Sequence, residues 1–354
     1  MGFTFGMPVW MRKHYFILSS LTLLEVITHF GQIYEDSRHY IKITYLFEGK
    51  NVAVDPYGFL RPLVPWLATF LDPMVGVGNA YGIVNSIFWL LATLIFYRFS
   101  LRVLNSRNQA LYSAILFTSS RPLLIYGAAV LTDMCGYLFI LIGIYLICFF
   151  HERWRDVFLA SILIGIGALG REVVLVCIVF ALLYAIALRK MGFKKLVVFI
   201  FISSVFLLIW TYHVGSPLRH IFWYDKAVRG SFEKGNFGPI PLAKSLAGAF
   251  WFSLFLAFVG FTRESGESLK LQYVVFISLI APLFLIPSDF RFTFILYPSI
   301  LTLAGKGVEH FAGIISEKPW FRILNERQWI PALLLLHVAF NNLVAYDFVS
   351  LPIP

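Results

Sequence analysis

The sequence predicts an all-α fold, a polytopic bundle of transmembrane helices, and three observations carry that prediction. Of the 354 residues, 59% are hydrophobic and 14% are charged. Soluble domains are about 45–50% apolar and about 25% charged, so this chain has too little polar surface to cover itself in water. Aromatic residues make up 18% of the chain, which excludes an intrinsically disordered protein. The third observation is a series of apolar runs long enough to cross a bilayer.

A helix needs about 20 mostly apolar residues to cross a bilayer, and fewer where protein covers part of it. The fifth and sixth candidate spans are joined only by Gly170-Arg171-Glu172. Glycines at 165, 167 and 170, together with this charge pair, favour a tight break over one long helix. We therefore expect about eleven spans, within one or two, at about 14–31, 79–97, 109–127, 131–150, 157–170, 172–188, 196–213, 246–262, 271–286, 292–305 and 329–346.

The basic charge balance agrees with a membrane topology. The net charge is +10. With the N-terminus in the cytoplasm, 17 of the 29 Lys and Arg fall in cytoplasmic segments, as the positive-inside rule requires. Topology therefore explains the excess of positive charge, and no nucleic-acid partner is needed. We expect an integral protein of the plasma membrane, or of the reticulum if the cell is eukaryotic.

Two external segments are too long to be simple connections, and such loops tend to carry function. The first covers about 32–78 and the second about 214–245. Apolar spacing predicts a helix between Arg38 and Lys50, and Tyr57 to Trp66 is typical of an interfacial helix with an aromatic belt. We expect one transmembrane domain over 1–354, with no soluble C-terminal domain.

Polar residues gather at the external ends of the spans, and each charge within a span costs about 2.5–3.5 kcal/mol on the insertion scale. Glu25 and His29 share a face of the first span, where we expect them to satisfy each other or Arg171. Arg121 precedes Pro122 and is expected to break the third span. The remaining candidates lie near one face of the membrane: Glu35, Asp36, Arg38, Asp133, Arg171, Glu172, His213, Arg219, His220, Tyr224, Lys226, Asp289 and Arg291.

The adjacent acids Glu35 and Asp36 have two interpretations. Two carboxylates just outside a membrane can bind a divalent cation such as Mg²⁺ or Mn²⁺, or one can act as a general base. The alternative is a solvated loop start or a helix cap formed by Asp36 and Ser37.

The arginines can bind phosphate, because the guanidinium fork matches phosphate oxygens. Arg171 with Glu172 could instead be a structural ion pair, since burying such a pair is expensive without a reason. The same alternatives hold for Asp289 and Arg291. Arg219 and His220 are phosphate contacts or residues that snorkel to the interface.

The order of these motifs resembles the GT-C superfamily of membrane glycosyltransferases, which includes protein O-mannosyltransferases, aminoarabinose transferases and oligosaccharyltransferase subunits. The resemblance covers about residues 10–310. It rests on five motifs: Tyr34-Glu35-Asp36-Ser37-Arg38-His39-Tyr40 in the first loop, Arg61-Pro62-Leu63-Val64-Pro65, Leu131-Thr132-Asp133, Leu169-Gly170-Arg171-Glu172, and Asp289-Phe290-Arg291 followed by Pro298. The acidic pair reads Glu-Asp where the family has Asp-x-Asp or Asp-Glu, and Gly170 stands where the family has Thr.

The resemblance implies a polyprenyl-phosphate sugar as donor and a lipid-linked glycan or another extracytoplasmic acceptor. Asp36 would be the general base of an inverting transfer, and Glu35 would orient it or bind a metal with it. Arg171, Arg219 and Arg291 would bind the donor phosphate. Acceptor binding or support would fall to Arg38, Asp133, Glu172, His220, Tyr224 and Asp289.

Other classes of protein remain open at this point. A transporter or flippase for a lipid-linked or anionic substrate would carry polar groups at the membrane midplane and inverted repeats. A membrane acyl- or phosphotransferase would use a histidine, with His39, His213 and His220 as candidates. A structural membrane subunit is a further alternative. The bias of charges to one face and the absence of a sequence repeat favour the glycosyltransferase.

Overall fold

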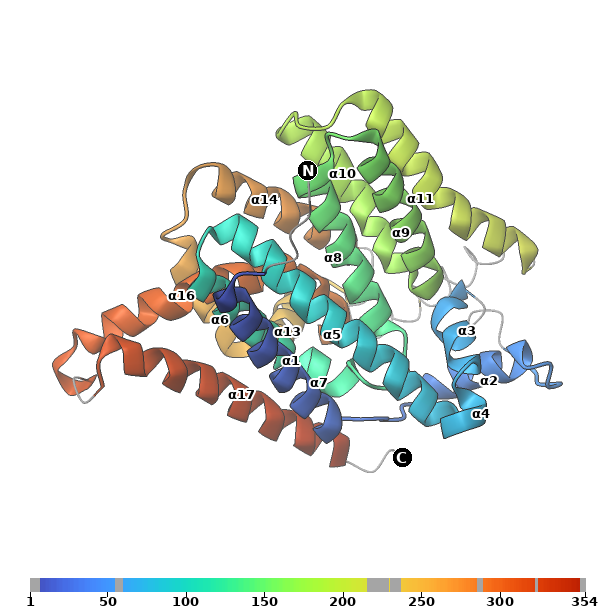
Figure 1. Cartoon of the computed structure of the whole chain (residues 1–354), viewed down its shortest axis with the longest axis horizontal. Helices are drawn as coiled ribbons and strands as arrows, with labels where there is room; N and C mark the ends of the chain where they lie inside the picture. Colours follow the sequence, from blue (N-terminus) through green and yellow to red (C-terminus); the bar gives the residue numbers. More distant parts are fainter. Residues whose placement is uncertain are drawn as a thin grey trace.

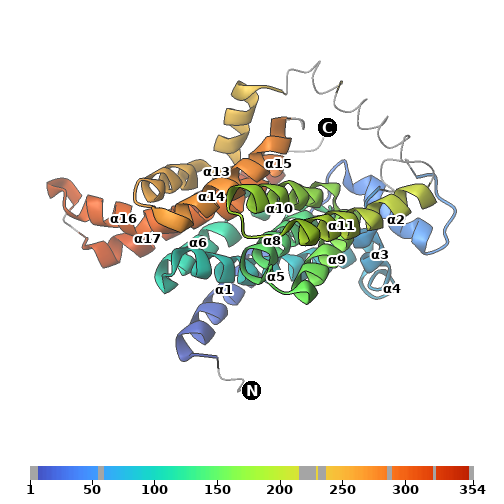
Figure 2. The ribbon, with the colours of Figure 1, turned by 90° about the horizontal axis from the view of Figure 1, so that it is seen from above.

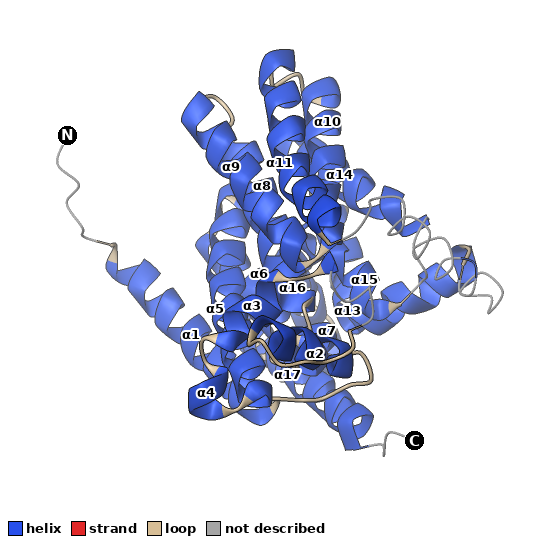
Figure 3. Cartoon of the chain, turned by 90° about the vertical axis from the view of Figure 1, so that its right-hand side faces the viewer, coloured by secondary structure: helices blue, strands red, loops and turns tan. Residues whose placement is uncertain are grey.

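A computed structural model describes residues 7–54, 60–214, 229, 237–284, 289–321 and 324–350, with side chains up to 346. Every regular element in these ranges is a helix (Figures 1 and 3). The long helices are α1 (Val9–Thr28), α5 (Val77–Leu104), α8 (Asp133–Phe150), α9 (Trp154–Gly170), α11 (Phe193–His213), α13 (Pro239–Phe261), α14 (Gly266–Ile280), α16 (Tyr297–Ser316) and α17 (Glu326–Ser350). The predicted all-α class is confirmed.

Each of the eleven predicted spans overlaps at least one helix of the described residues. Six of the helices in the described ranges are long and apolar enough to cross a membrane, namely α5, α8, α11, α13, α17 and the continuous segment Gly266–Phe284. The latter joins α14 to the 3₁₀ turn η3 (Ala281–Phe284). The segment Glu172–Ala187 is apolar but shorter. The number of helices that cross the membrane therefore stays a prediction.

The two expected helix breaks are present. α6 (Arg107–Thr118) ends before Ser119, and α7 (Arg121–Tyr126) starts at Arg121 with Pro122 in its first turn. A backbone N–H in the first turn has no partner within the helix, so the N–H that proline lacks is not missed there. α9 ends at Gly170, and the extended backbone of Arg171 leads into the 3₁₀ turn η2 (Glu172–Leu175) and then α10 (Val176–Ala187). Both breaks place polar residues at the ends of helices.

The described residues of the first external segment form three short helices, α2 (Ser37–Phe47), α3 (Leu63–Thr69) and α4 (Asp72–Val75). They lie together at the end of the molecule opposite α16 and α17 (Figure 2). The helix expected between Arg38 and Lys50 is therefore confirmed. The first residues of the expected interfacial helix, Tyr57 to Phe59, lie outside the described residues, and α3 begins only at Leu63.

Close backbone packing joins the C-terminal half of the chain. A Cβ atom on Gly307 would lie 1.9 Å from the carbonyl oxygen of Leu256, and one on Gly260 would lie 2.0 Å from the carbonyl oxygen of Leu303. The two glycines thus let α13 and α16 touch along their backbones, as small residues do in membrane helix pairs. α13 is also kinked at Trp251, whose φ is +38°.

The first and last helices share a polar contact that the sequence did not predict. The side-chain amide of Asn342 in α17 donates to Glu25 at 3.2 Å, and its oxygen lies 3.0 Å from Nε2 of His29. Arg171 binds Asp133 instead. The expectation that Glu25 and His29 satisfy each other or Arg171 is therefore wrong, because α17 brings a partner from 313 residues away.

Candidate active site

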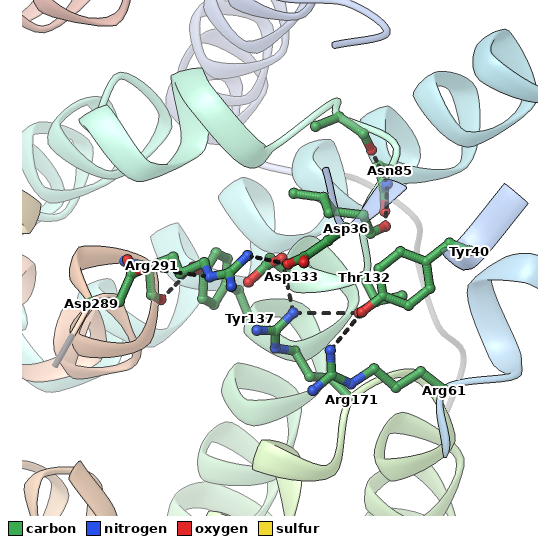
Figure 4. A network of polar contacts seen from close by, with 12 residues as sticks. Asp36, Tyr40, Arg61, Asn85, Thr132, Asp133, Tyr137, Arg171, Asp289 and Arg291 are labelled. Atoms are coloured by element: carbon green, nitrogen blue, oxygen red, sulfur yellow. Dashed lines mark hydrogen bonds and ion pairs between the residues drawn. The ribbon is translucent and has the colours of Figure 1, made fainter. Parts of the chain in front are cut away.

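Five charged side chains from four segments converge at one site (Figure 4). Asp36 lies at the start of α2, Asp133 at the start of α8 and Arg171 at the break after α9. Asp289 and Arg291 belong to α15 (Phe290–Thr293) and the residue before it. All five were expected to be functional from the sequence, and the fold brings them together.

Arg291 holds two of the carboxylates. Its Nη1 donates to Oδ2 of Asp36 at 3.0 Å, and its Nε lies 3.6 Å from Oδ2 of Asp289. Asp289 also caps α15, because its Oδ1 accepts the backbone N–H of Arg291 at 2.9 Å. The Asp36 side chain remains 49% exposed and that of Arg291 22% exposed, so this pair faces accessible space.

Arg171 and Asp133 form a second pair, and this one is buried. Their Nη1 and Oδ2 atoms are 2.9 Å apart, and both side chains are less than 5% exposed. Nη1 of Arg171 also lies within 3.4 Å of the Thr132 hydroxyl, to which it donates. Asp133 sits in the first turn of α8, where the helix dipole favours negative charge. Loss of one partner would leave an uncompensated buried charge.

Arg61 completes the cluster, and the sequence reasoning placed it only in a family motif. Its Nε and Nη2 donate to both oxygens of Glu172, at 2.8 and 2.5 Å, which is the two-point geometry that makes arginine pairs strong. Its Nη1 donates to the Tyr40 hydroxyl at 2.5 Å, and that hydroxyl also accepts from Thr132 at 3.4 Å. The signal for Arg61 was its place before Pro62 in the external loop. Its partner could not be identified from the sequence.

Aromatic rings fix the two guanidiniums. Phe292 lies between them, with its ring centre 5.3 Å from Arg171 and 5.1 Å from Arg291. Tyr137 donates its hydroxyl to the backbone carbonyl of Arg291 at 2.6 Å, and Tyr297 donates to the carbonyl of Tyr137 at 2.7 Å. These contacts hold the backbone from which the Arg291 side chain extends.

The field around Arg291 is negative. Burial opposes its charge, but the carboxylates of Asp133, Asp289 and Asp36 outweigh this effect, so the pKa of Arg291 is raised. The five convergent residues are three acids and two arginines, so the acids exceed the arginines by one charge. Because the site has one more carboxylate than guanidinium groups, a carboxylate is available to abstract a proton or to bind a cation.

Other predicted residues lie outside this cluster. Glu35 and Arg38 are exposed beside Asp36, and no hydrogen bond or ion pair joins their side chains to the described residues of the cluster. Arg219, His220, Tyr224 and Lys226 lie outside the described residues, and so does most of the second external segment.

The possible metal site was tested against the geometry. In the described part of the chain, no three His, Cys, Asp or Glu residues lie close enough to hold a metal ion. Asp36, one of the two proposed ligands, is held by Arg291. The described residues alone therefore do not form a complete metal site.

Comparisons with known proteins concern the family and the fold of the chain. The family described as dolichyl-phosphate-mannose-protein mannosyltransferase matches residues 56–214. That stretch contains Asp133, Arg171 and Glu172, but neither Asp36 nor Arg291. No curated protein sequence matches the chain.

Solved structures share its fold at low sequence identity. The archaeal oligosaccharyltransferase AglB from Archaeoglobus fulgidus, in complex with an inhibitory peptide and a dolichol-phosphate, is 12% identical, with a TM-score of 0.64 over 97% of this chain. ArnT from Cupriavidus metallidurans, bound to undecaprenyl phosphate, is 14% identical, with a TM-score of 0.59 over 94% of this chain. The chain spans 56% of the AglB chain and 72% of the ArnT chain.

The chain therefore has the fold of the GT-C membrane glycosyltransferases. The resemblance that the sequence motifs predicted is confirmed by the shared architecture and by the family match over residues 56–214.

Proposed function

We propose that this protein is a membrane glycosyltransferase that moves a sugar from a polyprenyl-phosphate donor to an extracytoplasmic acceptor, a lipid-linked glycan being the first candidate. The observation that carries the proposal is the pair between Asp36 and Arg291, with the buried pair of Arg171 and Asp133 beside it. The pair of Asp36 and Arg291 joins an accessible carboxylate to a partly exposed guanidinium. The family match and the lipid phosphates bound to the two structural neighbours support this choice of donor.

The donor phosphate would bind at Arg291. This guanidinium is partly exposed, and its planar fork suits phosphate oxygens better than a lysine would. Arg171 is almost fully buried and held by Asp133, so it would act through its field rather than by direct contact. Both positive charges stabilise the negative charge that the departing polyprenyl phosphate gains. Arg219 remains a further phosphate ligand in the proposal.

Asp36 would act as the general base. Its carboxylate takes the proton of the acceptor hydroxyl while that oxygen bonds to the anomeric carbon of the sugar. The bond between the anomeric carbon and the phosphate oxygen breaks in the same displacement, and polyprenyl phosphate leaves. A donor phosphate that takes over Arg291 would free Asp36 from its ion pair, so donor binding would activate the base.

The expected stereochemical outcome is inversion. A double displacement needs a second carboxylate that can reach the anomeric carbon as a nucleophile. Asp133 is buried and bound by Arg171, and Asp289 is engaged in capping α15 and in contact with Arg291. Neither is placed for covalent catalysis, which supports a single displacement with Asp36 as base.

A divalent metal stays a secondary part of the proposal. Mg²⁺ is usually held by one or two carboxylates together with substrate phosphates and water. Glu35 and Asp36 could supply such carboxylates once a donor phosphate is bound. Asp133, Glu172 and Asp289 would support the site, and Arg38, His220 and Tyr224 would meet the acceptor.

The proposal is tested by transfer assays with the purified chain in lipid nanodiscs. The protein is incubated with labelled polyprenyl-phosphate sugars and a membrane glycolipid extract, with and without EDTA. We expect labelled glycolipid and released polyprenyl phosphate from wild type, no product from Asp36→Asn, and full activity from Asp72→Asn, an acid of the same external segment outside the cluster. Full activity of a folded Asp36→Asn protein would overturn the assignment of the base.

The second candidate is a transporter or flippase for a lipid-linked substrate. It would need a polar path through the membrane, whereas the charged pairs described above gather at the starts of α2, α8 and α15 and the end of α9. Movement of labelled donor across liposomes, without any transfer, would favour this candidate over the enzyme.

A further inference from the structure

A polar cavity lies at the end of α8 opposite the candidate active site. It has a volume of about 470 Å³ and is lined by Cys148, His151, Glu152, Tyr184, Lys190 and Lys195. α8 connects the two sites, because it begins at Asp133 in the candidate active site and ends at Phe150 beside this cavity. At about 1.5 Å per residue its 18 residues separate the two sites by roughly 27 Å. The cavity is therefore not part of the transfer site.

The connections that form this cavity are strongly basic. One joins α8 to α9 and the other joins α10 to α11, and both lie at the end of the bundle away from α2 and α4 (Figure 3). The acids near these connections are Glu152, Asp156 and Glu267, the last of which accepts a hydrogen bond from Lys190. The basic residues in the two connections and the first turns of α9 and α11 outnumber them: Arg153, Arg155, Arg189, Lys190, Lys194 and Lys195.

The two lysines that line the cavity are held in place. Nζ of Lys195 donates to the backbone carbonyls of His151, at 3.1 Å, and Glu152. Nζ of Lys190 donates to Glu267 at 3.2 Å, in a pair whose side chains are about half exposed. An ammonium has three N–H donors, so each lysine retains donor capacity for an anion in the cavity.

The backbone next to Lys190 is strained. Arg189 has φ of +53°, a left-handed conformation that glycine usually adopts. Strain of this kind tends to persist at functional positions. Arg189 follows the end of α10, where the chain turns toward α11, and this turn places Lys190 in the lining of the cavity beside Lys195.

Apolar side chains surround the basic connections. Trp154 opens α9, Ile186 lies in the last turn of α10 and Phe193 opens α11, and all three are exposed. Nζ of Lys195 lies 5.9 Å from the centre of the Trp154 ring. A ligand for this place would carry an anionic head at the cavity and hydrocarbon along the neighbouring helices.

We propose that this cavity binds the head group of an anionic phospholipid. Basic pockets between transmembrane helices are the usual sites for such head groups. In the proposed orientation the lipid belongs to the cytoplasmic leaflet. The proposal does not depend on the glycosyltransferase activity, because it rests on the other end of the bundle.

Lipid binding is measured by native mass spectrometry and by thermal unfolding in detergent, with phosphatidylglycerol, phosphatidylcholine or inorganic phosphate added. We expect phosphatidylglycerol to stay bound and to raise Tm for wild type, with little effect from the other two. Lys190→Ala should lose most of this retention while keeping the contacts of Lys195 with the connection between α8 and α9. Lys318→Ala is the matched control, since it removes a charge from an exposed position on the same proposed face.

The outcomes separate the possible sources of the effect. Equal loss in Lys190→Ala and Lys318→Ala would mean general attraction to a basic face and would overturn the proposal. An equal rise in Tm with inorganic phosphate would mean a soluble anion and would also overturn it. Selective loss in Lys190→Ala, with Tm in the absence of lipid unchanged, would support the head-group site.

Discussion

The Arg291 guanidinium donates to the Asp36 carboxylate across 3.0 Å, although the two residues are 255 positions apart in the chain. The pair neutralises the charge of a carboxylate that could otherwise take up a proton or a cation before the substrates bind. It also links donor binding to the proposed base, because a donor phosphate that binds Arg291 must compete with Asp36 for the guanidinium. The proposed base is therefore released only when a donor is present.

Arg291 is the first residue to test beyond Asp36. Replacement by Gln removes the guanidinium charge, and loss of one such stabilising group typically lowers kcat by about 100-fold or more. We expect Arg291→Gln to show this loss together with a raised KM for the donor. Arg291→Lys should lose less, because it keeps the charge but not the fork. Lys42→Gln, on the exposed face of α2, is the control; wild-type kinetics for Arg291→Gln would contradict the proposed phosphate site.

Tyr137 should act as a positioning residue through the backbone of Arg291. Tyr137→Phe removes the hydrogen bond to the Arg291 carbonyl and costs about 1 kcal/mol of stability. We expect the donor KM to rise while the pH profile of transfer is unchanged. Tyr184→Phe removes a similar buried bond, to the Cys148 carbonyl, at the other end of the molecule. If both variants lose stability equally and neither changes KM, Tyr137 has only a structural role.

The pair of Arg61 and Glu172 should contribute mainly to stability. Breaking a buried ion pair costs about 3–5 kcal/mol, and the 20% exposure of Glu172 places this pair at or below the lower end of that range. We expect Arg61→Gln to lower Tm clearly. Combining it with Glu172→Gln should restore part of the loss, since no unpaired charge remains. Additive losses in this double-mutant cycle would show that the two residues do not interact.

The contact between α13 and α16 predicts the effect of a single methyl group. A Cβ at Gly307 would lie 1.9 Å from a backbone oxygen that cannot move away. We expect Gly307→Ala to destabilise the protein by about 1–3 kcal/mol, measured as lower yield of monodisperse protein and lower Tm. Gly313→Ala in the same helix meets only Glu326 at 4.0 Å and should be tolerated. Equal tolerance of both would argue against the close crossing.

An external acid pair predicts a pH effect on stability. Partial burial and the neighbouring Glu48 raise the pKa of Asp72, so the folded protein disfavours its charged form. Stability should therefore fall as the pH rises through this pKa. We expect Asp72→Asn to raise Tm at pH 8 by up to about 2 °C, and to have a smaller effect at pH 4, where a larger fraction of the carboxyl is protonated. A larger effect at pH 4 would contradict this sign.

Local signals predicted the helical class and the positions at which the chain breaks. Pro122 beside Arg121, and Arg171 after Gly170, interrupt apolar runs in ways that depend only on their neighbours. Asp133 was expected to open a helix and does so. These features depend on residues within one or two turns of each other, which is the range over which a sequence pattern is informative.

The sequence did not predict which charged residues bind each other. Arg171 and Glu172 are neighbours in the chain, yet one binds Asp133 and the other binds Arg61, because they leave the break in different directions. Arg61 was visible in a motif, but only the packing of the external segment against η2 gives it a partner. Asn342 offered no signal at all, since a single amide in an apolar helix has many possible neighbours.

The distance along the chain between Asp36 and Arg291 also has a consequence during biosynthesis. At about 5–20 residues per second, the ribosome needs roughly 13 to 50 s to deliver Arg291 after Asp36. Throughout that interval the first loop carries its carboxylate without the guanidinium that later holds it. Nascent chains truncated before residue 291 should thus lack the proposed phosphate site, and efficient sugar transfer would report that the chain has been inserted at least as far as Arg291.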